Sequence, residues 1–167
     1  MAHRLESAGG AAVEPIRREF GDAVASPDGS IDRRRLSSLV FGNPKALAKL
    51  NAIVHPLVAA EVRRWLADYV KTPFRVVVVP LLYEVGFDKE FDFDAVMAVV
   101  CSEEVQMARL AGRGHTRDEA LARIAAQMPC GTKASLADYA IENNTSLEDL
   151  KDKIRSAVAD ILKHTEV

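Results

Sequence analysis

The stretch that decides the fold class reads Arg75–Val76–Val77–Val78–Val79–Pro80–Leu81–Leu82–Tyr83–Glu84. Its consecutive valines show no period-2 alternation, which is typical of a strand covered on both faces, as in a parallel sheet between helices. Pro80 cannot donate a ladder hydrogen bond, so we expect strand pairing to stop there. Glu84 follows beyond the carboxyl end, at the edge where open α/β sheets place their ligands. From this stretch alone, a Glu84 in a ligand site and a solvated Glu84 are equally compatible with the sequence.

Two further segments have the pattern of strands, and helical patterns separate them. Ala95–Cys101 is an apolar run typical of a buried strand, and Ala137–Ile141 predicts a shorter strand. Thr116, with Glu119 three positions later, has the pattern of a capping box, and Ser146 is typical of the cap of a final amphipathic helix. Strands that alternate with helices predict an α/β protein with right-handed parallel crossovers.

The N-terminal part of the chain is predicted to be helical. Ala11–Phe20 has an apolar face at helical spacing, and Asn43 followed by Pro44 is typical of a helix start. We expect Pro56 to end the helix that begins at Pro44 and to start the next one. At that elbow the side chain of His55 either contacts a ligand or, as is commoner for a lone histidine, packs or caps a helix.

Composition narrows the class of protein. The chain has 167 residues, of which 49% are hydrophobic, enough to bury a core in one domain. The formal charge of -2 argues against a nucleic-acid partner attracted by bulk charge. Cys101 and Cys130 lack metal-site spacing, which favours reduced thiols. No apolar run reaches membrane-spanning length and no signal peptide is visible, so we expect a cytoplasmic protein without a membrane partner.

No hydrolase motif (GxSxG, HExxH) and no metal-ligand spacing occur, so we predict no metal bound by these residues alone. A segment dense in arginine stands out instead, with Arg109, Arg113, Arg117 and Arg123. Arg109 and Arg113 are four apart and share a helix face if the helix extends that far. Guanidinium groups at such positions suit phosphate oxygens. Arginine content alone, however, favours two solvated helix faces over an anion site.

The chain resembles dephospho-CoA kinase, a P-loop kinase of the nucleoside-monophosphate-kinase type. Order and spacing agree from about residue 2 to about residue 150. The matching pieces, in chain order, are Phe20–Gly21, Gly29–Arg33, His55–Pro56, Pro80–Glu84, Asp94, Gln106 with Arg109 and Arg113, Arg123 with Gln127, Lys133, Ala137–Asp138 and Ile141–Asn143.

The resemblance implies a single kinase domain over residues 1–167 with a P-loop NTPase-like parallel sheet and helices on both faces. Residues from about 11 to 72 would form a helical region on the CoA side, and residues from about 113 to 133 the lid. The implied reaction transfers the γ-phosphoryl group of ATP, with Mg²⁺, to the ribose 3′-hydroxyl of dephospho-CoA. That reaction is the last step of coenzyme A biosynthesis.

The resemblance also assigns residues to substrate binding. Arg33 and His55 should contact dephospho-CoA, and Leu82 and Glu84 should face the acceptor and the phosphates. A third pair, Gln127 and Lys133, matches the second half of the lid.

On the ATP side the resemblance points to three residues. Arg113, with Arg109 behind it, belongs to the lid that closes on ATP and is assigned to catalysis, and Asn143 lies on the adenine side. These are the expected catalytic and ATP-binding residues.

One departure from the family pattern is large. The family opens with a strand, a Gly-rich phosphate loop ending in Lys-Ser/Thr, a helix and a second strand ending in an acidic pair. This chain contains no GxxxxGK[ST]. That loop supplies the N–H cradle, the Lys and the Mg²⁺-binding hydroxyl. We therefore expect the first strands to be missing, ATP and Mg²⁺ binding to require the missing loop, and the chain alone to be inactive.

The missing first strand is the central one, so its loss should leave a gap between the valine strand and Ala95–Cys101. Three outcomes are open: the strands close up, another copy fills the gap by self-association, or the gene product is longer. We favour the last of these, a truncated sequence. An alternative function is a degenerate paralogue that binds CoA-type ligands without ATP. A different nucleotide kinase fits less well, because Arg33 and His55–Pro56 match the acceptor side of this family.

Overall fold

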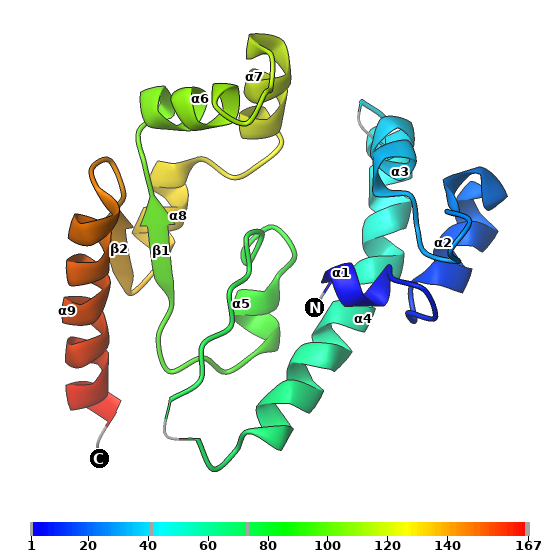
Figure 1. Cartoon of the computed structure of the whole chain (residues 1–167). Helices are drawn as coiled ribbons and strands as arrows, with labels where there is room; N and C mark the ends of the chain where they lie inside the picture. The colour runs from blue at the N-terminus through cyan, green and yellow to red at the C-terminus, as the bar shows by residue number, and fades with distance from the viewer. Residues whose placement is uncertain (1, 41, 73, 166–167) are drawn as a thin grey trace. The chain divides into compact units, whose positions relative to one another are not determined.

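The computed structural model describes residues 2–40, 42–72 and 74–165. The chain divides into two compact units, residues 1–78 and 79–167, which are described separately (Figure 1).

The first unit is helical in its described residues. Its elements are α1 (Ala2–Leu5), α2 (Val13–Phe20), a 3₁₀ turn η1 (Asp22–Val24), α3 (Arg33–Val40) and the long helix α4 (Pro44–Asp68). Helices α1, α2 and α3 all pack against α4 (Figure 1). Ile16 and Val24 are completely buried in the core between these elements. The expected helix over Ala11–Phe20 is thus confirmed, with its first turn at Val13.

Local signals are confirmed at the start of α4. The Asn43 side chain accepts a hydrogen bond from the backbone N–H of Ala46 at 3.1 Å, and Pro44 occupies the first turn. This arrangement satisfies one of the donors that a helix N-terminus leaves open, while the missing N–H of proline costs nothing there.

The expected break at His55–Pro56 is wrong, because α4 runs through Pro56 without interruption. Proline inside a helix removes the hydrogen bond to the carbonyl four residues earlier, here Ala52. Apolar residues on both sides of Pro56 pack against one core, so a continuous helix buries them together and outweighs the lost bond. These residues are Leu50, Ile53, Val54, Leu57 and Val58.

The second unit holds the sheet. Its elements are α5 (Phe87–Glu90), β1 (Met97–Val100), α6 (Glu103–Ala111), α7 (Arg117–Ala125), α8 (Cys130–Leu136), β2 (Tyr139–Glu142) and α9 (Leu147–Thr165). β1 and β2 pair in parallel, with Met97 opposite Tyr139 and Val100 opposite Glu142. Helix α8 packs against both strands and α9 packs against β2 (Figure 1). The two expected strands and the α/β class with a parallel sheet are confirmed.

The valine stretch is a correction. Residues 74–79 contain no strand, and the side chains of Val76 and Val78 are 59% and 86% exposed. Exposure alternates along the stretch, as in an extended segment, but among the described residues only β1 and β2 form a sheet. A strand is stable only with a ladder partner, and none of the described residues pairs with the valines. The valine pattern thus indicates a segment able to form a strand, but the described residues provide no strand to pair with it.

The second unit also has few buried side chains. Its fully buried apolar residues, among those described, are Phe87, Phe91, Ala120 and Ile141, and Val99 on β1 is half exposed. Most of the buried apolar residues belong to the first unit instead.

Candidate functional site

The carboxyl ends of β1 and β2 bring together residues that are far apart in the sequence. The backbone N–H of Asn143 donates to the carbonyl of Val100 at 2.7 Å, so both strands end at the same edge. Helix α6 begins there, because Ser102 follows β1 and its hydroxyl accepts from the N–H of Val105 at 3.3 Å. Arg109 lies about two turns along α6, and its guanidinium reaches back to this edge. Its Nη2 donates to the backbone oxygen of Asn143 at 2.9 Å and to its Oδ1 at 3.1 Å.

Further side chains fix the same edge, and the sequence analysis did not single them out as site residues. Asn144 Oδ1 accepts a hydrogen bond from the N–H of Ser102 at 2.8 Å. The amide of Gln106 donates to the carbonyl of Cys101 and lies 3.2 Å from the sulfur of Cys130. Both cysteines are free thiols. The signal that could have found Asn144 is its place just after β2.

Arg113 lies outside the helix that carries Arg109. Helix α6 ends at Ala111 with Gly112 as its cap, so the two arginines do not share a helix face as expected. Gly114 has a φ of +86°, a conformation that glycine adopts without strain, and it turns the chain toward α7. Arg113 is exposed, and in the described part of the chain its guanidinium is free to meet an anion.

The loop after Arg113 has the expected start of α7. The Thr116 hydroxyl accepts from the N–H of Glu119 at 3.3 Å, and Glu119 Oε2 accepts from the N–H of Thr116 at 2.9 Å, which confirms the capping box. The hydrogen bond from the Thr116 N–H, above all, holds the pKa of the Glu119 carboxyl below its ordinary value. Gln127, two residues beyond α7, donates to the backbone oxygen of Arg123 at 3.4 Å. Local hydrogen bonds thus order both ends of α7.

Glu84 and Lys133 form an ion pair, with Nζ and Oε1 2.8 Å apart. Glu84 Oε1 also accepts from the N–H of Met128 at 2.9 Å, and Lys133 Nζ also donates to the carbonyl of Pro80 at 3.1 Å. Burial alone would raise the pKa of the Glu84 carboxyl, but the hydrogen bonds from Lys133 and Met128 outweigh it and the pKa lies below its ordinary value. Leu82, half buried in the same loop, accepts the N–H of Phe87 through its carbonyl at 3.0 Å.

Arg33 and His55 belong to the first unit. Arg33 opens α3, and its Nε donates to Glu6 Oε2 at 2.7 Å while its Nη1 contacts the ring of His3. His55 is half buried on α4, and burial lowers its pKa below the ordinary value because the charged ring loses hydration there. The Arg33 guanidinium is therefore held in place by its neighbours, and His55 favours the neutral form.

The described residues do not fit a resident metal or a phosphate cradle. They contain no group of three His, Cys, Asp or Glu side chains that could hold a metal ion, and the sequence contains no GxxxxGK[ST]. No helix in the described residues is long and apolar enough to cross a membrane.

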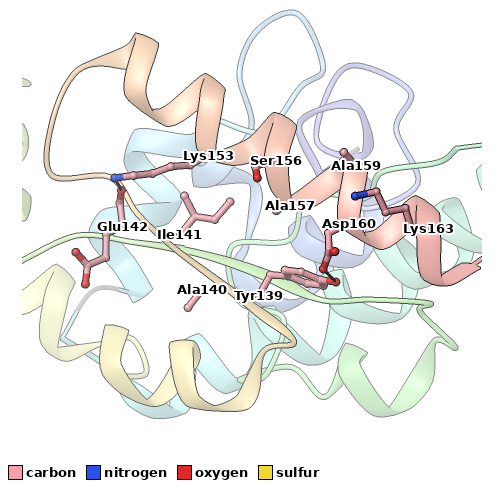
Figure 2. A pocket seen from close by; sticks show the side chains of 10 residues that line it. All are labelled: Tyr139, Ala140, Ile141, Glu142, Lys153, Ser156, Ala157, Ala159, Asp160 and Lys163. Atoms are coloured by element: carbon pink, nitrogen blue, oxygen red, sulfur yellow. Dashed lines mark hydrogen bonds between the residues drawn. The ribbon is translucent and has the colours of Figure 1, made fainter.

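An open groove of about 700 Å³ lies between β2 and α9 (Figure 2). The Tyr139 hydroxyl donates to Asp160 Oδ2 at 2.9 Å across it, and Lys153 Nζ donates to the backbone oxygen of Glu142 at 3.1 Å (Figure 2). None of the expected site residues lines this groove. Of the expected site residues, Arg109 and Asn143 meet instead at the carboxyl edge of the sheet.

A small parallel sheet flanked by helices makes the second unit an α/β structure, which is consistent with a P-loop-like fold. The dephospho-CoA kinase family matches residues 1–149. The chain belongs to the dephospho-CoA kinase family, which confirms the resemblance inferred from the sequence. This family consists of kinases of coenzyme A biosynthesis that use ATP.

Two curated dephospho-CoA kinases illustrate the similarity. The chain is 43% identical over 160 residues to that of Symbiobacterium thermophilum, covering 94% of this chain and 66% of the relative. It is 40% identical over 151 residues to that of Aromatoleum aromaticum, covering 90% of this chain and 73% of the relative. The chain thus spans about two thirds of the first relative's length.

Solved structures agree with the fold. TT1252 from Thermus thermophilus matches with a TM-score of 0.60 at 33% identity, covering 90% of this chain and 81% of that chain. A dephospho-CoA kinase from Campylobacter jejuni matches with a TM-score of 0.64, covering 98% of this chain and 82% of that chain. At 22% identity the second match shows the fold alone.

Proposed function

We propose that the protein acts in the phosphorylation of the ribose 3′-hydroxyl of dephospho-CoA by ATP, the last step of coenzyme A biosynthesis, in the cytoplasm. Membership of the dephospho-CoA kinase family is the observation that carries this proposal. The contact between Arg109 and Asn143 supports it, because it puts a cationic side chain at the edge of the sheet where α/β proteins bind ligands.

On the acceptor side, we assign Arg33 and His55 to contacts with dephospho-CoA, within a helical region of residues from about 11 to 72. Arg33 is suited to an anionic ligand because Glu6 and His3 already fix its orientation, so less side-chain entropy is lost on binding. His55 favours its neutral form and can donate or accept a hydrogen bond. In the second unit, we assign Leu82, next to Glu84, to the acceptor as well.

On the nucleotide side, we assign Arg113 to the lid of residues from about 113 to 133 and to the charge that develops on the transferred phosphoryl group. An exposed guanidinium on a loop with a positive-φ glycine can move onto a phosphate without breaking an existing contact. Arg109 lies behind it and Asn143 faces the adenine. Gln127 and Lys133 belong to the second half of the lid.

Binding of ATP with Mg²⁺ needs a phosphate loop, and this sequence holds no GxxxxGK[ST]. Loss of a single oxyanion-type hydrogen-bond donor already lowers the rate of an enzyme by about 10²–10³. We therefore propose that the 167-residue chain alone binds dephospho-CoA but does not turn it over. The same absence favours a second candidate, a non-catalytic protein that binds CoA-type ligands without ATP.

Calorimetry tests these proposals, with dephospho-CoA and MgATP titrated separately into the chain. We expect dephospho-CoA to bind and Arg33→Ala to weaken it about tenfold or more, while Arg155→Ala, an exposed pair with Asp152 on α9, serves as a matched control. Absence of dephospho-CoA binding by a folded chain would overturn the acceptor assignment. Binding of MgATP favours the kinase, whereas its absence with dephospho-CoA binding retained favours the second candidate. Formation of coenzyme A by the chain would contradict the proposed inactivity.

Self-association is a further part of the proposal. In the described residues β1 pairs with β2 alone, so the opposite edge of β1 carries no strand, and such an edge can pair with another copy of the chain. Light scattering over a range of concentrations tests this, and a mass that stays monomeric at every concentration would contradict it.

A further inference from the structure

The Glu84–Lys133 pair joins three segments of the second unit. Glu84 lies in the loop that follows the valine stretch, Lys133 on α8, and Met128 between α7 and α8. The fourth partner, Pro80, precedes Glu84 in the same loop. The pair therefore connects the loop of residues 80–86 to both sides of the turn that leads into α8.

The side chain of Glu84 is 20% exposed and that of Lys133 is 16% exposed, although Glu84 taken with its backbone is an exposed residue. A charged group at such low exposure requires partners, and each has two: Glu84 accepts from Lys133 and from the Met128 amide, while Lys133 donates to Glu84 and to the Pro80 carbonyl. Substrate binding by either group would first require breaking contacts that already satisfy its charge. The geometry favours a role in holding protein segments over direct contact with a ligand.

We propose that Glu84 and Lys133 are a positioning pair that fixes the returning end of the lid, at Met128, to the loop of residues 80–86. This inference rests on the proposed function in that it treats residues 113–133 as a lid. It adds that the moving part of the lid has two fixed ends, which are the glycine turn at Gly114 and the anchored amide of Met128. Helix α7 would then rotate between these two points, without displacement of α8.

Amide hydrogen exchange on the whole chain tests the anchor directly, with the Met128 amide as the readout. We expect Glu84→Ala to accelerate exchange at Met128 by about tenfold or more, the factor expected for losing a charged acceptor. Lys133→Met should accelerate it less, and Lys133→Arg should restore exchange close to that of the unchanged chain because the cation is kept. Asp152→Asn, which removes an exposed ion pair on α9, is the matched control.

Exchange in β1 and β2 separates positioning from general stability. A Met128 rate in Glu84→Ala within about twofold of the unchanged chain would overturn the proposal. Equal acceleration at Met128 and in both strands would also overturn it, because the pair would then only hold the second unit together. Failure of Lys133→Arg to restore the Met128 rate would argue against a role for the charge.

A second measurement needs no variant and covers the case in which Glu84→Ala does not fold. The ¹⁵N–¹H resonance of Met128 should follow the titration of the carboxyl that accepts it, and the groups facing that carboxyl are Lys133 and the Met128 amide itself. A Met128 resonance that does not move across the acidic range would overturn the proposal. Neither readout depends on kinase activity, so absence of turnover or of dephospho-CoA binding would count against the proposed function and leave the anchor to be decided by exchange.

Discussion

The guanidinium of Arg109 donates two hydrogen bonds to Asn143, one to the backbone oxygen at 2.9 Å and one to Oδ1 at 3.1 Å. The two residues lie on α6 and directly after β2, so the contact ties a helix to the carboxyl end of the neighbouring strand. Nη2 carries two N–H groups, so this one nitrogen can donate to both oxygens of Asn143. The contact therefore both orders the sheet edge and presents a cation there.

Arg109→Ala should lower the free energy of unfolding by about 1–3 kcal/mol, because it leaves the partly buried carbonyl of Asn143 without its donor. Arg113→Ala should change stability by less than about 0.5 kcal/mol, because Arg113 is exposed. Urea unfolding of both variants, followed by circular dichroism, checks this. Equal losses in the two variants would show that the Arg109–Asn143 contact contributes little.

Caps and turns could be predicted from the sequence because they depend on neighbours three or four residues away. Asn43 and Thr116 each accept the backbone N–H that their positions predicted. The parallel pairing of β1 with β2 was also predictable, since alternating strands and helices leave few other topologies.

Features that depend on distant parts of the chain were not predictable in the same way. The valine stretch has the composition of a strand, but strand formation also needs a partner. Pro56 has the local chemistry of a helix end, but packing on both sides overrides it. The Glu84–Lys133 pair joins residues whose contact no local pattern encodes. The family resemblance singled out both positions, and only the structure identified their partners.

Val78 and Ile16 provide a test of where the core lies. Val78→Thr should change the free energy of unfolding by less than about 0.5 kcal/mol, because its side chain is 86% exposed. Ile16→Ala should lower it by about 2–5 kcal/mol, because Ile16 is fully buried in the first unit. Chemical denaturation measures both. A loss above about 1 kcal/mol in Val78→Thr would indicate that the valine stretch is a buried strand in solution.

His55 should give the first unit a pH-dependent stability. Because burial lowers its pKa in the folded state, the unfolded chain takes up the proton first on acidification. The free energy of unfolding should therefore fall as the pH drops below about 6.5, and level off below the lower folded-state pKa. Trp65, the chain's single tryptophan, lies on the same helix and reports the unfolding of this unit by fluorescence.

His55→Gln should remove this component of the pH dependence, so its unfolding midpoint should vary less between about pH 5 and pH 7.5 than that of the unchanged chain. His164→Gln, an exposed histidine on α9, is the control and should leave the profile as it was. An identical slope in His55→Gln and in the unchanged chain would show that His55 does not titrate differently on folding.

Pro56→Ala should stabilise the first unit. Pro56 is exposed within the continuous helix α4, so its replacement loses no packing and allows a hydrogen bond to the carbonyl of Ala52. Alanine is favoured over proline inside a helix by about 3 kcal/mol, and the greater freedom of the unfolded chain offsets about 1 kcal/mol of this, so we expect a gain of about 1–2 kcal/mol. Pro44→Ala is the matched control, since Pro44 occupies the first turn where no hydrogen bond is missing. A gain of equal size in both variants, or none in Pro56→Ala, would mean that α4 is interrupted at Pro56 in solution, as the sequence alone predicted. Reduced binding of dephospho-CoA by the stabilised Pro56→Ala chain would instead show that the proline orients His55 for the acceptor.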